Sequence, residues 1–349
     1  MNIGVTTVKG EDYHPNFRLK EAASNKGHSL FFIDPYSYVP GIIHKDFLIN
    51  KSSDACVRVA APEAAASGGV LNIAERDAAP GFSVMDTVPN TFARGVVQHG
   101  ISDVTVPDVV IPRQGAMIGT FSLTLTSHFK NMGIPMVNDI EPIIIASNQF
   151  LTLQHLARTG ISVPDTLFIS SLDNLSGAVH ILGGYPVIAK EINGRQGRGV
   201  FLLDSKNEAL SVALSFLDRE KGLLLQRFIP IKGRRDIRVL VVGGKVAGAM
   251  ELFTSGEDFR ANYHLNNRAA KINLSKEMKD AAVKAASAVG LDIAGVDLIV
   301  DKKGRIMVIE VNYSPGFKGI EKTTGLDIAG LIIDYAFLLC SSMIKPFKT

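Results

Sequence analysis

The residues best suited to chemistry lie near the C-terminal end of the chain, in two apolar stretches that carry a few polar side chains. The pattern predicts two β-strands joined by a two-residue turn at Lys303 and Gly304. In that register Asp297 lies opposite Glu310, and Asn312 shares the strand face of Glu310. Two carboxylates and an amide oxygen suit a hard cation such as Mg²⁺ with nucleotide phosphates. Because an exposed polar face would give the same pattern, other segments have to decide.

A glycine-rich stretch between two predicted strands is a second candidate site. Glycines let backbone N–H groups approach phosphate oxygens, and a lysine at the end of the first strand supplies charge. No Gly-Lys-Ser/Thr follows and both flanking elements are predicted strands, so this is not a Walker loop. Many hairpins contain turn glycines, so the pattern alone favours an ordinary turn. The residues concerned are Lys190, Gly194, Gln196, Gly197 and Gly199.

The next apolar strand runs into a polar and aromatic segment formed by Gln226, Arg227, Phe228 and Ile229. Backbone groups in such a segment can bind the edge of an adenine while Phe or Ile packs on its ring. Taken alone, the segment is better explained as a core strand. The basic run Lys232–Arg235 that follows is interpreted as a solvated turn.

Two arginines are candidates for binding anionic groups. Asp236 and Arg238 alternate onto one strand face, and Arg260 and Asn262 would do the same in an extended segment. The forked donors of arginine match carboxylate and phosphate oxygens. An internal ion pair between Asp236 and Arg238 is an equally good interpretation. Glu251, on the following strand, is a further acid that could join the metal cluster.

Composition and length narrow the class of protein. The chain has 349 residues, 46% of them hydrophobic and 20% charged, which predicts a globular protein with roughly two or three domains. The net charge of +3 gives no general argument for a nucleic-acid partner. Cys56 and Cys340 match no metal or redox spacing, and neither a signal peptide nor a membrane-spanning run is recognised. We therefore expect a cytoplasmic protein with no membrane partner.

Periodicity predicts three regions. Residues 1–140 form an N-terminal α/β domain that opens with a βαβ unit and contains an inserted or irregular segment at about 56–102. Residues 141–222 contain one linker helix and a small α+β subdomain with the glycine-rich turn. Residues 223–349 form a C-terminal subdomain with longer strands. The predicted strands are 3–8, 30–33, 109–112, 135–138, 186–191, 200–203, 223–228, 236–242 and 245–252, and the predicted helices are 17–26, 119–131, 142–159, 172–182, 207–219, 276–289 and 327–343.

The order of these features resembles the ATP-grasp superfamily and, within it, the RimK-like amino-acid ligases. The resemblance covers roughly residues 106–340 and the opening βαβ unit. It implies an α/β and α+β protein, an ATP-grasp fold behind a Rossmann-like N-terminal domain. The stretches that carry it are Arg235–Gly243, Asp258–Asn262, Ala294–Asp297, Val311–Gly316 and Gly319–Gly330.

The resemblance implies an ATP-dependent carboxylate-amine ligase that works through an acyl phosphate. Its cofactors would be ATP and Mg²⁺, with Mn²⁺ as the alternative metal. Its partners would be an amino acid such as glutamate and a carboxylate on a small molecule, peptide or protein C-terminus, and relatives often form dimers or tetramers. The implied roles are catalysis for Arg238 and Arg260, nucleotide binding for Lys190, Gly194, Gln196, Gly197, Gly199, Gln226, Arg227, Phe228, Ile229, Asp236 and Asn262, and metal binding for Asp297, Glu310 and Asn312.

Three departures from the family pattern leave alternatives open. Gln149 stands where relatives usually carry a phosphate-contacting lysine, Leu252 and Phe253 replace arginines of the glutamate-adding type, and the 56–102 segment is atypical. An active ligase with altered substrates is the main hypothesis. A nucleotide-binding regulatory protein without ligase turnover is the alternative. A kinase is disfavoured because the chain has neither a His-Arg-Asp loop nor an Asp-Phe-Gly motif.

Overall fold

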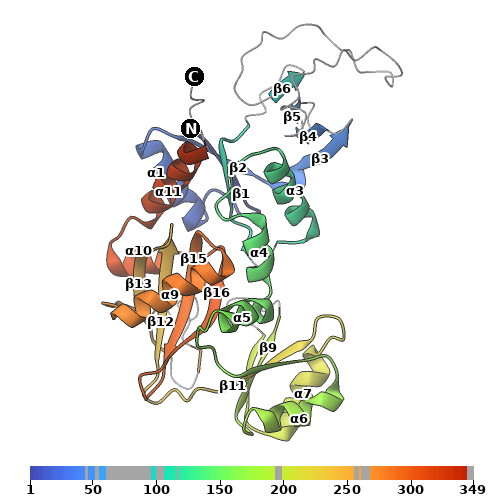
Figure 1. The fold of residues 1–349 in the computed structure, drawn as a ribbon, viewed down its shortest axis with the longest axis vertical. Helices are drawn as coiled ribbons and strands as arrows, with labels where there is room; N and C mark the ends of the chain where they lie inside the picture. The colour runs from blue at the N-terminus through green and yellow to red at the C-terminus, as the bar shows by residue number, and fades with distance from the viewer. Residues whose placement is uncertain are drawn as a thin grey trace. The chain divides into compact units, whose positions relative to one another are not determined.

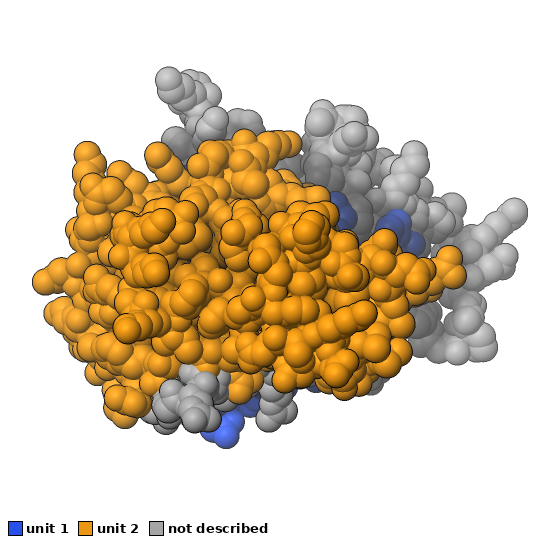
Figure 2. Space-filling view, turned by 90° about the horizontal axis from the view of Figure 1, so that it is seen from below, with its two compact units in different colours: residues 1–140, 336–349 blue, residues 141–335 orange. Residues whose placement is uncertain are grey.

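The computed structural model describes residues 1–43, 46–51, 55–59, 96–99, 106–115, 118–192, 199–254, 259–260 and 268–343. The chain divides into two compact units, shown as a ribbon in Figure 1 and in separate colours in Figure 2. Unit 1 comprises residues 1–140 and 336–349, and unit 2 comprises residues 141–335. The boundary near the C-terminal end falls inside helix α11 (Ile328–Met343).

Unit 1 is built on a parallel sheet with strand order β2-β1-β7. Its core strands are apolar on both faces, with Ile3, Val5, Val110 and Ile111 fully buried, as expected for a parallel sheet covered on both sides. The predicted βαβ beginning is confirmed. The elements are β1 (Asn2–Thr6), α1 (His14–Asn25), β2 (Ser29–Ile33), η1 (Pro35–Ser37), β7 (Val109–Pro112) and α3 (Thr120–Asn131).

Unit 1 also contains an antiparallel sheet of order β3-β4-β5-β6 that the sequence did not predict. β5 and β6 fall inside the segment expected to be irregular, but the sheet already begins at Tyr38. The rest of the segment 56–102 lies outside the described residues. These strands are short and lack a clear apolar alternation, which is why periodicity did not find them. They are β3 (Tyr38–Ile43), β4 (Asp46–Lys51), β5 (Ala55–Val59) and β6 (Val96–His99).

The predicted single linker helix is wrong, because two helices occupy that stretch. α4 (Ile140–Ser147) ends before Asn148, and α5 (Gln149–Arg158) begins after it. The side-chain oxygen of Asn148 accepts hydrogen bonds from the backbone N–H groups of Phe150 (3.0 Å) and Leu151 (3.1 Å). Asparagine is a strong N-cap, so it starts a new helix here instead of continuing the old one.

The smaller sheet of unit 2 is antiparallel with strand order β10-β9-β11-β8. Its strands and two helices enclose a core that includes Leu203, Leu223 and Leu225. β11 pairs with β8 and β9, although the expected subdomain boundary at residue 222 precedes it. The elements are β8 (Thr166–Ile169), η3 (Leu172–Asn174), α6 (Leu175–Ile181), β9 (Val187–Glu191), β10 (Val200–Leu203), α7 (Lys206–Phe216) and β11 (Leu223–Arg227).

The larger sheet of unit 2 is also antiparallel, with strand order β14-β13-β12-β15-β16. Helix α9 packs against it, starting at a Ser275 cap and ending at Gly290, whose φ of 81° suits glycine. The predicted strands and α9 are confirmed, whereas β14 and α10 were not predicted. The elements are β12 (Arg235–Val242), β13 (Lys245–Leu252), β14 (Ala269–Lys271), α9 (Lys276–Val289), β15 (Ile293–Val300), β16 (Ile306–Asn312) and α10 (Lys318–Thr324).

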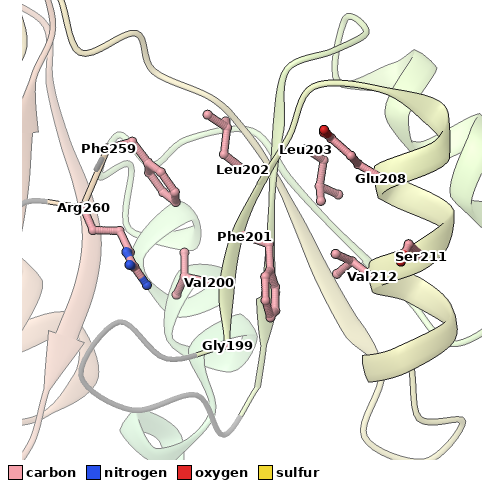
Figure 3. A pocket seen from close by; sticks show the side chains of 10 residues that line it. All are labelled: Gly199, Val200, Phe201, Leu202, Leu203, Glu208, Ser211, Val212, Phe259 and Arg260. Carbon is pink, nitrogen blue, oxygen red and sulfur yellow. The ribbon is translucent and has the colours of Figure 1, made fainter. Parts of the chain in front are cut away.

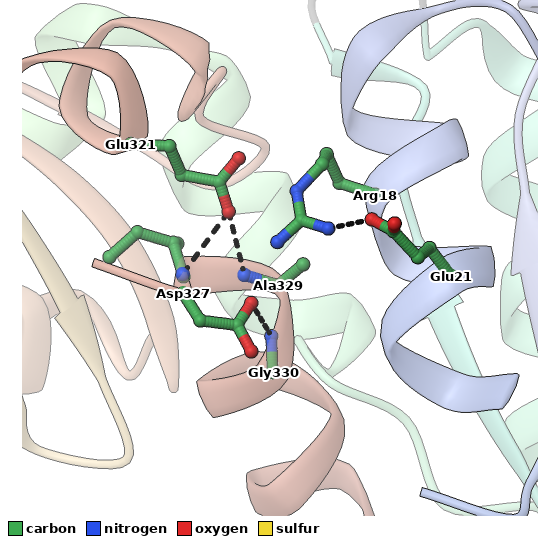
Figure 4. Close-up of polar contacts among 7 residues, drawn as sticks. Arg18, Glu21, Glu321, Asp327, Ala329 and Gly330 are labelled. Carbon is green, nitrogen blue, oxygen red and sulfur yellow. Dashed lines mark hydrogen bonds and ion pairs between the residues drawn. The ribbon is translucent and has the colours of Figure 1, made fainter. Parts of the chain in front are cut away.

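Two acidic side chains of unit 2 cap the start of α11 (Figure 4). Glu321 accepts hydrogen bonds from the backbone N–H groups of Ile328 (3.1 Å) and Ala329 (3.2 Å), and Asp327 accepts one from that of Gly330 (2.9 Å).

In the described part of the chain no single helix is long and apolar enough to cross a membrane, and only α10 and α11 together, bent by 117°, reach that length and composition.

Candidate functional site

The acids predicted to face each other do so. Asp297 on β15 pairs with Glu310 on β16, and Asn312 lies two residues further along β16. On the neighbouring strand, Arg238 pairs with Asp297. Directly paired residues project to the same face of a sheet, so Arg238, Asp297 and Glu310 form one polar row across three strands.

The turn that leads to this pairing differs from the prediction. β15 ends at Val300 and β16 begins at Ile306, so the connection is longer than two residues. Asp301 organises it by accepting the backbone N–H groups of Lys303 and Arg305, each at 2.9 Å. Near the turn the register is therefore one residue away from the predicted one.

A β-bulge restores the predicted pairing further along the hairpin. The register shifts between Asp297 and Leu298, so that Leu298 faces Val308 while Asp297 faces Glu310, and Ile309 is the extra residue. Without this bulge, strand alternation would turn Glu310 to the opposite face. The pairing was predicted correctly because the turn error and the missing bulge cancel.

Arg238 holds Asp297 with two parallel hydrogen bonds, Nε to Oδ1 at 2.7 Å and Nη2 to Oδ2 at 2.5 Å. Both side chains are less than one-fifth exposed. The expected alternative, an ion pair between Asp236 and Arg238, is wrong, because each of these residues has a different partner. Such a fork is a strong, oriented contact that leaves lone pairs on both carboxylate oxygens.

The charges in the polar row influence one another strongly. Loss of hydration raises the pKa of the Glu310 carboxyl, and the charge of Asp297 raises it further, while Arg238 and Lys190 oppose the shift. Glu310 is nevertheless solvent-accessible, so a ligand can reach it. Burial lowers the pKa of Arg238, but the charge and hydrogen bonds of Asp297 raise it above its ordinary value.

Lys190, at the end of β9, belongs to the same electrostatic cluster. Burial lowers the pKa of its ammonium group, and the charges of Glu310 and Asp297 partly restore it. A lysine of the smaller sheet and two acids of the larger sheet therefore act on one another. This is the arrangement expected where a polyanion and a cation bind between two sheets.

Asp297, Glu310 and Asn312 fit a divalent cation. Two facing carboxylates repel each other, and the charge of Asp297 adds to the effect of burial in raising the pKa of Glu310, so a cation between them would relieve that repulsion. The Asn312 amide oxygen accepts the backbone N–H of Ser314 (3.0 Å), which fixes its position and leaves a lone pair. No cluster of three or more His, Cys, Asp or Glu residues suited to a metal is found among the described residues, so the amide would be the third protein ligand.

Arg234 is an organising residue that the sequence analysis missed. It was interpreted as part of a solvated turn, but its side chain is only 6% exposed. It pairs with Asp236 (2.9 Å) and donates to the carbonyls of Ile229 (3.0 Å) and Phe259 (2.7 Å). Arg234 therefore holds the predicted adenine segment to the stretch that carries Arg260. Burial raises the pKa of Asp236, and Arg234 opposes that shift.

The predicted adenine segment spans the end of β11. Gln226 is buried and donates from Nε2 to Thr166 Oγ1 (2.9 Å), so its side chain is engaged within the smaller sheet. Arg227 is exposed and pairs with Asp165 (2.8 Å). Phe228 and Ile229 are half-buried, and the Phe228 ring meets Phe259 edge-on at 6.3 Å. Only the backbone and these two apolar side chains remain suited to an adenine.

Arg260 lies beside the edge strand β10. With Phe259 it lines one side of a shallow pocket of about 460 Å³, whose other residues come from β10 and α7 (Figure 3). Gly199 closes the pocket at a φ of 73°, and a side chain there would meet the Glu191 carboxylate. Gly194, Gln196, Gly197 and Asn262 lie outside the described residues.

Two further polar residues have assigned contacts. Glu251 does not join the acid pair, because it pairs with Ile237 on the opposite face of the sheet and holds Arg235 at 2.7 and 2.8 Å. Gln149, in the first turn of α5, donates to the carbonyl of the bulge residue Ile309 (3.3 Å). It thus reaches the backbone next to Glu310 without adding charge.

A family model for the RimK-like ATP-grasp domain matches residues 146–336. The chain belongs to the RimK-like ATP-grasp family. The probable alpha-L-glutamate ligases of Legionella pneumophila and Coxiella burnetii are each 40% identical to it over 228 residues, which is 65% of this chain and 75% of each relative. The protein is an ATP-dependent carbon-nitrogen ligase of this family.

Solved structures confirm the predicted ATP-grasp fold. The ATP-grasp ligase PsnB complexed with a minimal precursor has a TM-score of 0.64 at 19% identity, covering 97% of this chain and 98% of that one. The macrocyclase MdnC of Microcystis aeruginosa, bound with precursor peptide MdnA, has a TM-score of 0.64 at 13% identity, covering 97% and 100%. The D-alanine–D-alanine ligase of Bacillus anthracis complexed with ATP has a TM-score of 0.62 at 14% identity, covering 98% of both chains.

Proposed function

We propose that this ligase joins an amino acid to a carboxylate through an acyl-phosphate intermediate. The observation that carries the proposal is the facing pair Asp297 and Glu310, with Lys190 and Arg238 acting on it electrostatically. Carboxylates that would bind a cation lie beside positively charged side chains that would bind phosphate, as in-line phosphoryl transfer requires.

In the proposed first step a carboxylate oxygen of the acceptor attacks the γ-phosphorus of ATP, and the bond from that phosphorus to the bridging oxygen of ADP breaks. An amine then attacks the acyl carbon. The bond from carbon to the phosphoryl oxygen breaks, so phosphate leaves with an oxygen of the original carboxylate, and the amine loses its proton to solvent. No covalent intermediate with the protein is needed.

Each side chain would have a definite part in these steps. Lys190, Arg238 and Arg260 neutralise phosphate charge, and Phe228 and Ile229 pack on the adenine ring. Asp297, Glu310 and Asn312 would hold Mg²⁺, or Mn²⁺ in its place, and such a cation would offset phosphate charge. Asp236 acts through Arg234 and not on the nucleotide directly.

Glutamate is the proposed amine substrate, supported by relatives named probable alpha-L-glutamate ligases. The proposed acceptor is a small acid, a peptide or a protein C-terminus, supported by neighbours bound with precursor peptides. We also propose a cytoplasmic homo-oligomer, a dimer or a tetramer, with the three regions 1–140, 141–222 and 223–349 as its domains.

The test follows oxygen atoms. Full-length protein is incubated with ATP, Mg²⁺, pooled amino acids and a panel of acceptors labelled with ¹⁸O at both carboxylate oxygens, and products and phosphate are analysed by mass spectrometry. The proposal expects a condensed product together with one ¹⁸O in each released phosphate. A product with unlabelled phosphate would contradict the acyl phosphate. ATP binding without ADP release across the whole panel would favour the nucleotide-binding regulatory protein instead.

A further inference from the structure

Buried polar side chains gather at one end of the parallel sheet of unit 1. β1 ends at Thr6, and the backbone N–H of Arg113, which directly follows β7, donates to the Thr6 carbonyl (2.8 Å). Arg113 and Gln114 therefore emerge beside Thr6 and Thr7. All four side chains are at most 6% exposed.

The connections place this end at the point where the sheet changes direction. From β1 the chain passes through α1 to β2 on one side. From β7 it passes through α3 to Met136, which forms a parallel bridge with Val110 on the other side. With right-handed crossovers, α1 and α3 lie on opposite faces, and they diverge at the carboxyl ends of β1 and β7. In open α/β sheets, ligands bind in such a crevice.

Several polar atoms here have no hydrogen-bond partner within the described part of the chain. They are Thr6 Oγ1, Asn16 Oδ1, Ser122 Oγ, and both Nε2 and Oε1 of Gln114. Asn16 is otherwise held firmly, because its amide nitrogen donates to the carbonyls of Lys9 and Gly10, each at 2.9 Å. Folded proteins rarely leave buried polar atoms unmatched, and their concentration in one crevice indicates an external partner.

The chemistry of the crevice limits what that partner can be. Arg113 supplies a buried positive charge. Burial lowers its pKa to about 10, with Tyr13 opposing the shift, so the guanidinium stays protonated at neutral pH. A guanidinium matches a carboxylate, whereas the oxygens of Thr6, Asn16 and Gln114 accept hydrogen bonds from a donor such as an ammonium group.

We infer that the crevice at the carboxyl ends of β1 and β7 binds a small molecule that carries both a carboxylate and an amino group, an α-amino acid being the simplest. Arg113 binds the carboxylate, and Thr6, Asn16 and Gln114 accept the hydrogens of the amino group. The role of this molecule as a ligation substrate rests on the proposed function, but its binding does not.

Binding is tested on the full chain without ATP, by thermal unfolding and calorimetry with the twenty amino acids, acetate and phosphate. The variants Thr6→Val and Gln114→Met keep side-chain size and remove the unmatched polar atoms. At least one amino acid should raise the Tm of the wild type, while acetate and phosphate should not. Without ligand, both variants should unfold at a higher Tm than the wild type, because buried polar atoms that lack hydrogen-bond partners have been removed. They should also lose the amino-acid shift, with Kd raised at least about tenfold.

Thr124→Val is the matched control, since Thr124 is an exposed residue of α3 in the same unit, and it should keep the full shift. The inference is overturned if no amino acid shifts the wild type, if acetate or phosphate does so equally, or if Thr6→Val and Gln114→Met keep the shift. A lower Tm of both variants without ligand would also overturn it, by showing that water already satisfies these atoms. Ligated product without an amino-acid shift would reject this inference alone, and a shift without any product would reject only the ligase proposal.

Discussion

The polar row of the larger sheet and the crevice of unit 1 use buried polar groups in opposite ways. In the row, Arg238 and Asp297 satisfy each other with two short hydrogen bonds. In the crevice, both polar atoms of Gln114 and the hydroxyl of Thr6 lack partners among the described residues. In the polar row the buried charges are therefore paired before any ligand binds. In the crevice the buried polar atoms would be paired only when a ligand is present.

This difference predicts opposite responses to mutation. Removing one charge of the polar row leaves its buried partner without a counter-charge. Both the stability and the activity of the protein should therefore fall. Removing unmatched polarity from the crevice should raise stability while abolishing binding. Two substitutions probe the polar row, a third probes the buried ion pair of Arg234 with Asp236 in the same unit, and the variants of Thr6 and Gln114 probe the crevice.

Glu310→Gln should have the largest effect. The substitution keeps the size of the side chain and removes the charge that faces Asp297, so the proposed cation loses a ligand. We expect turnover to fall by roughly 10²- to 10³-fold with the fold intact, measured as ADP release and condensed product.

Glu251→Gln is the matched control, because Glu251 lies in the same sheet on the opposite face, paired with Arg235. Its turnover should stay within about threefold of the wild type, as for a partly exposed ion pair. Equal losses in the two variants would mean that the face of the sheet does not matter, and the metal role of Glu310 would have to be abandoned.

Asp297→Asn should come next, through stability. Arg238 would lose the carboxylate that holds it while remaining largely buried, so we expect the free energy of unfolding to fall by about 2 to 3 kcal/mol in urea titrations. Asp165→Asn breaks the exposed pair with Arg227 and should cost at most about 0.5 kcal/mol. An Asp297→Asn protein as stable as the wild type would show that the row is not internally compensated.

Arg234→Met should have the smallest effect of the three on turnover, although it leaves the largely buried Asp236 without its partner and should also lower the free energy of unfolding. The variant keeps most of the apolar packing but releases Asp236 and the carbonyls of Ile229 and Phe259, so the adenine segment loses its anchor. We expect the KM for ATP to rise about tenfold, equivalent to about 1.4 kcal/mol, with a smaller change in kcat. Arg235→Met removes an exposed neighbour and should change the KM for ATP less than about twofold. If both variants had the same KM for ATP, Arg234 would not position the adenine segment.

Local features of the fold could be predicted because they are written in consecutive residues. The bounds of β10, β13 and α9 agree with the prediction, since turns at Gly243 and Gly244 and caps at Ser275 and Gly290 mark them directly. β8 and β14 are too short to show a period. The break at Asn148 was missed because apolar residues continue on both sides of it.

The candidate site was predictable where it depends on alternation along strands. Alternation places Glu310 and Asn312 on one face, whereas Asp297 faces Glu310 only because of the β-bulge, and the pairing of Arg238 with Asp297 was not predicted. The positioning roles of Arg234 and Gln149 could not be predicted, because they depend on hydrogen bonds to backbone carbonyls. Every residue carries such a carbonyl, so the sequence does not single out the partner. The crevice of unit 1 was invisible for a related reason, since the absence of a partner is a property of the folded chain alone.

The chain connects the two sheets of unit 2 twice, and hydrogen bonds hold both connections to the side of the larger sheet. Before β8, the Ser162 carbonyl accepts a hydrogen bond from the backbone N–H of Val308 (2.9 Å). After β11, Arg234 donates a hydrogen bond to the carbonyl of Ile229 (3.0 Å). Any rotation of the smaller sheet must therefore pivot within residues 163–165 and 227–230. Both stretches line one pocket of about 360 Å³, so a compound bound there would restrict this rotation, and because Phe228 and Ile229 also line the pocket it would disturb the adenine segment as well.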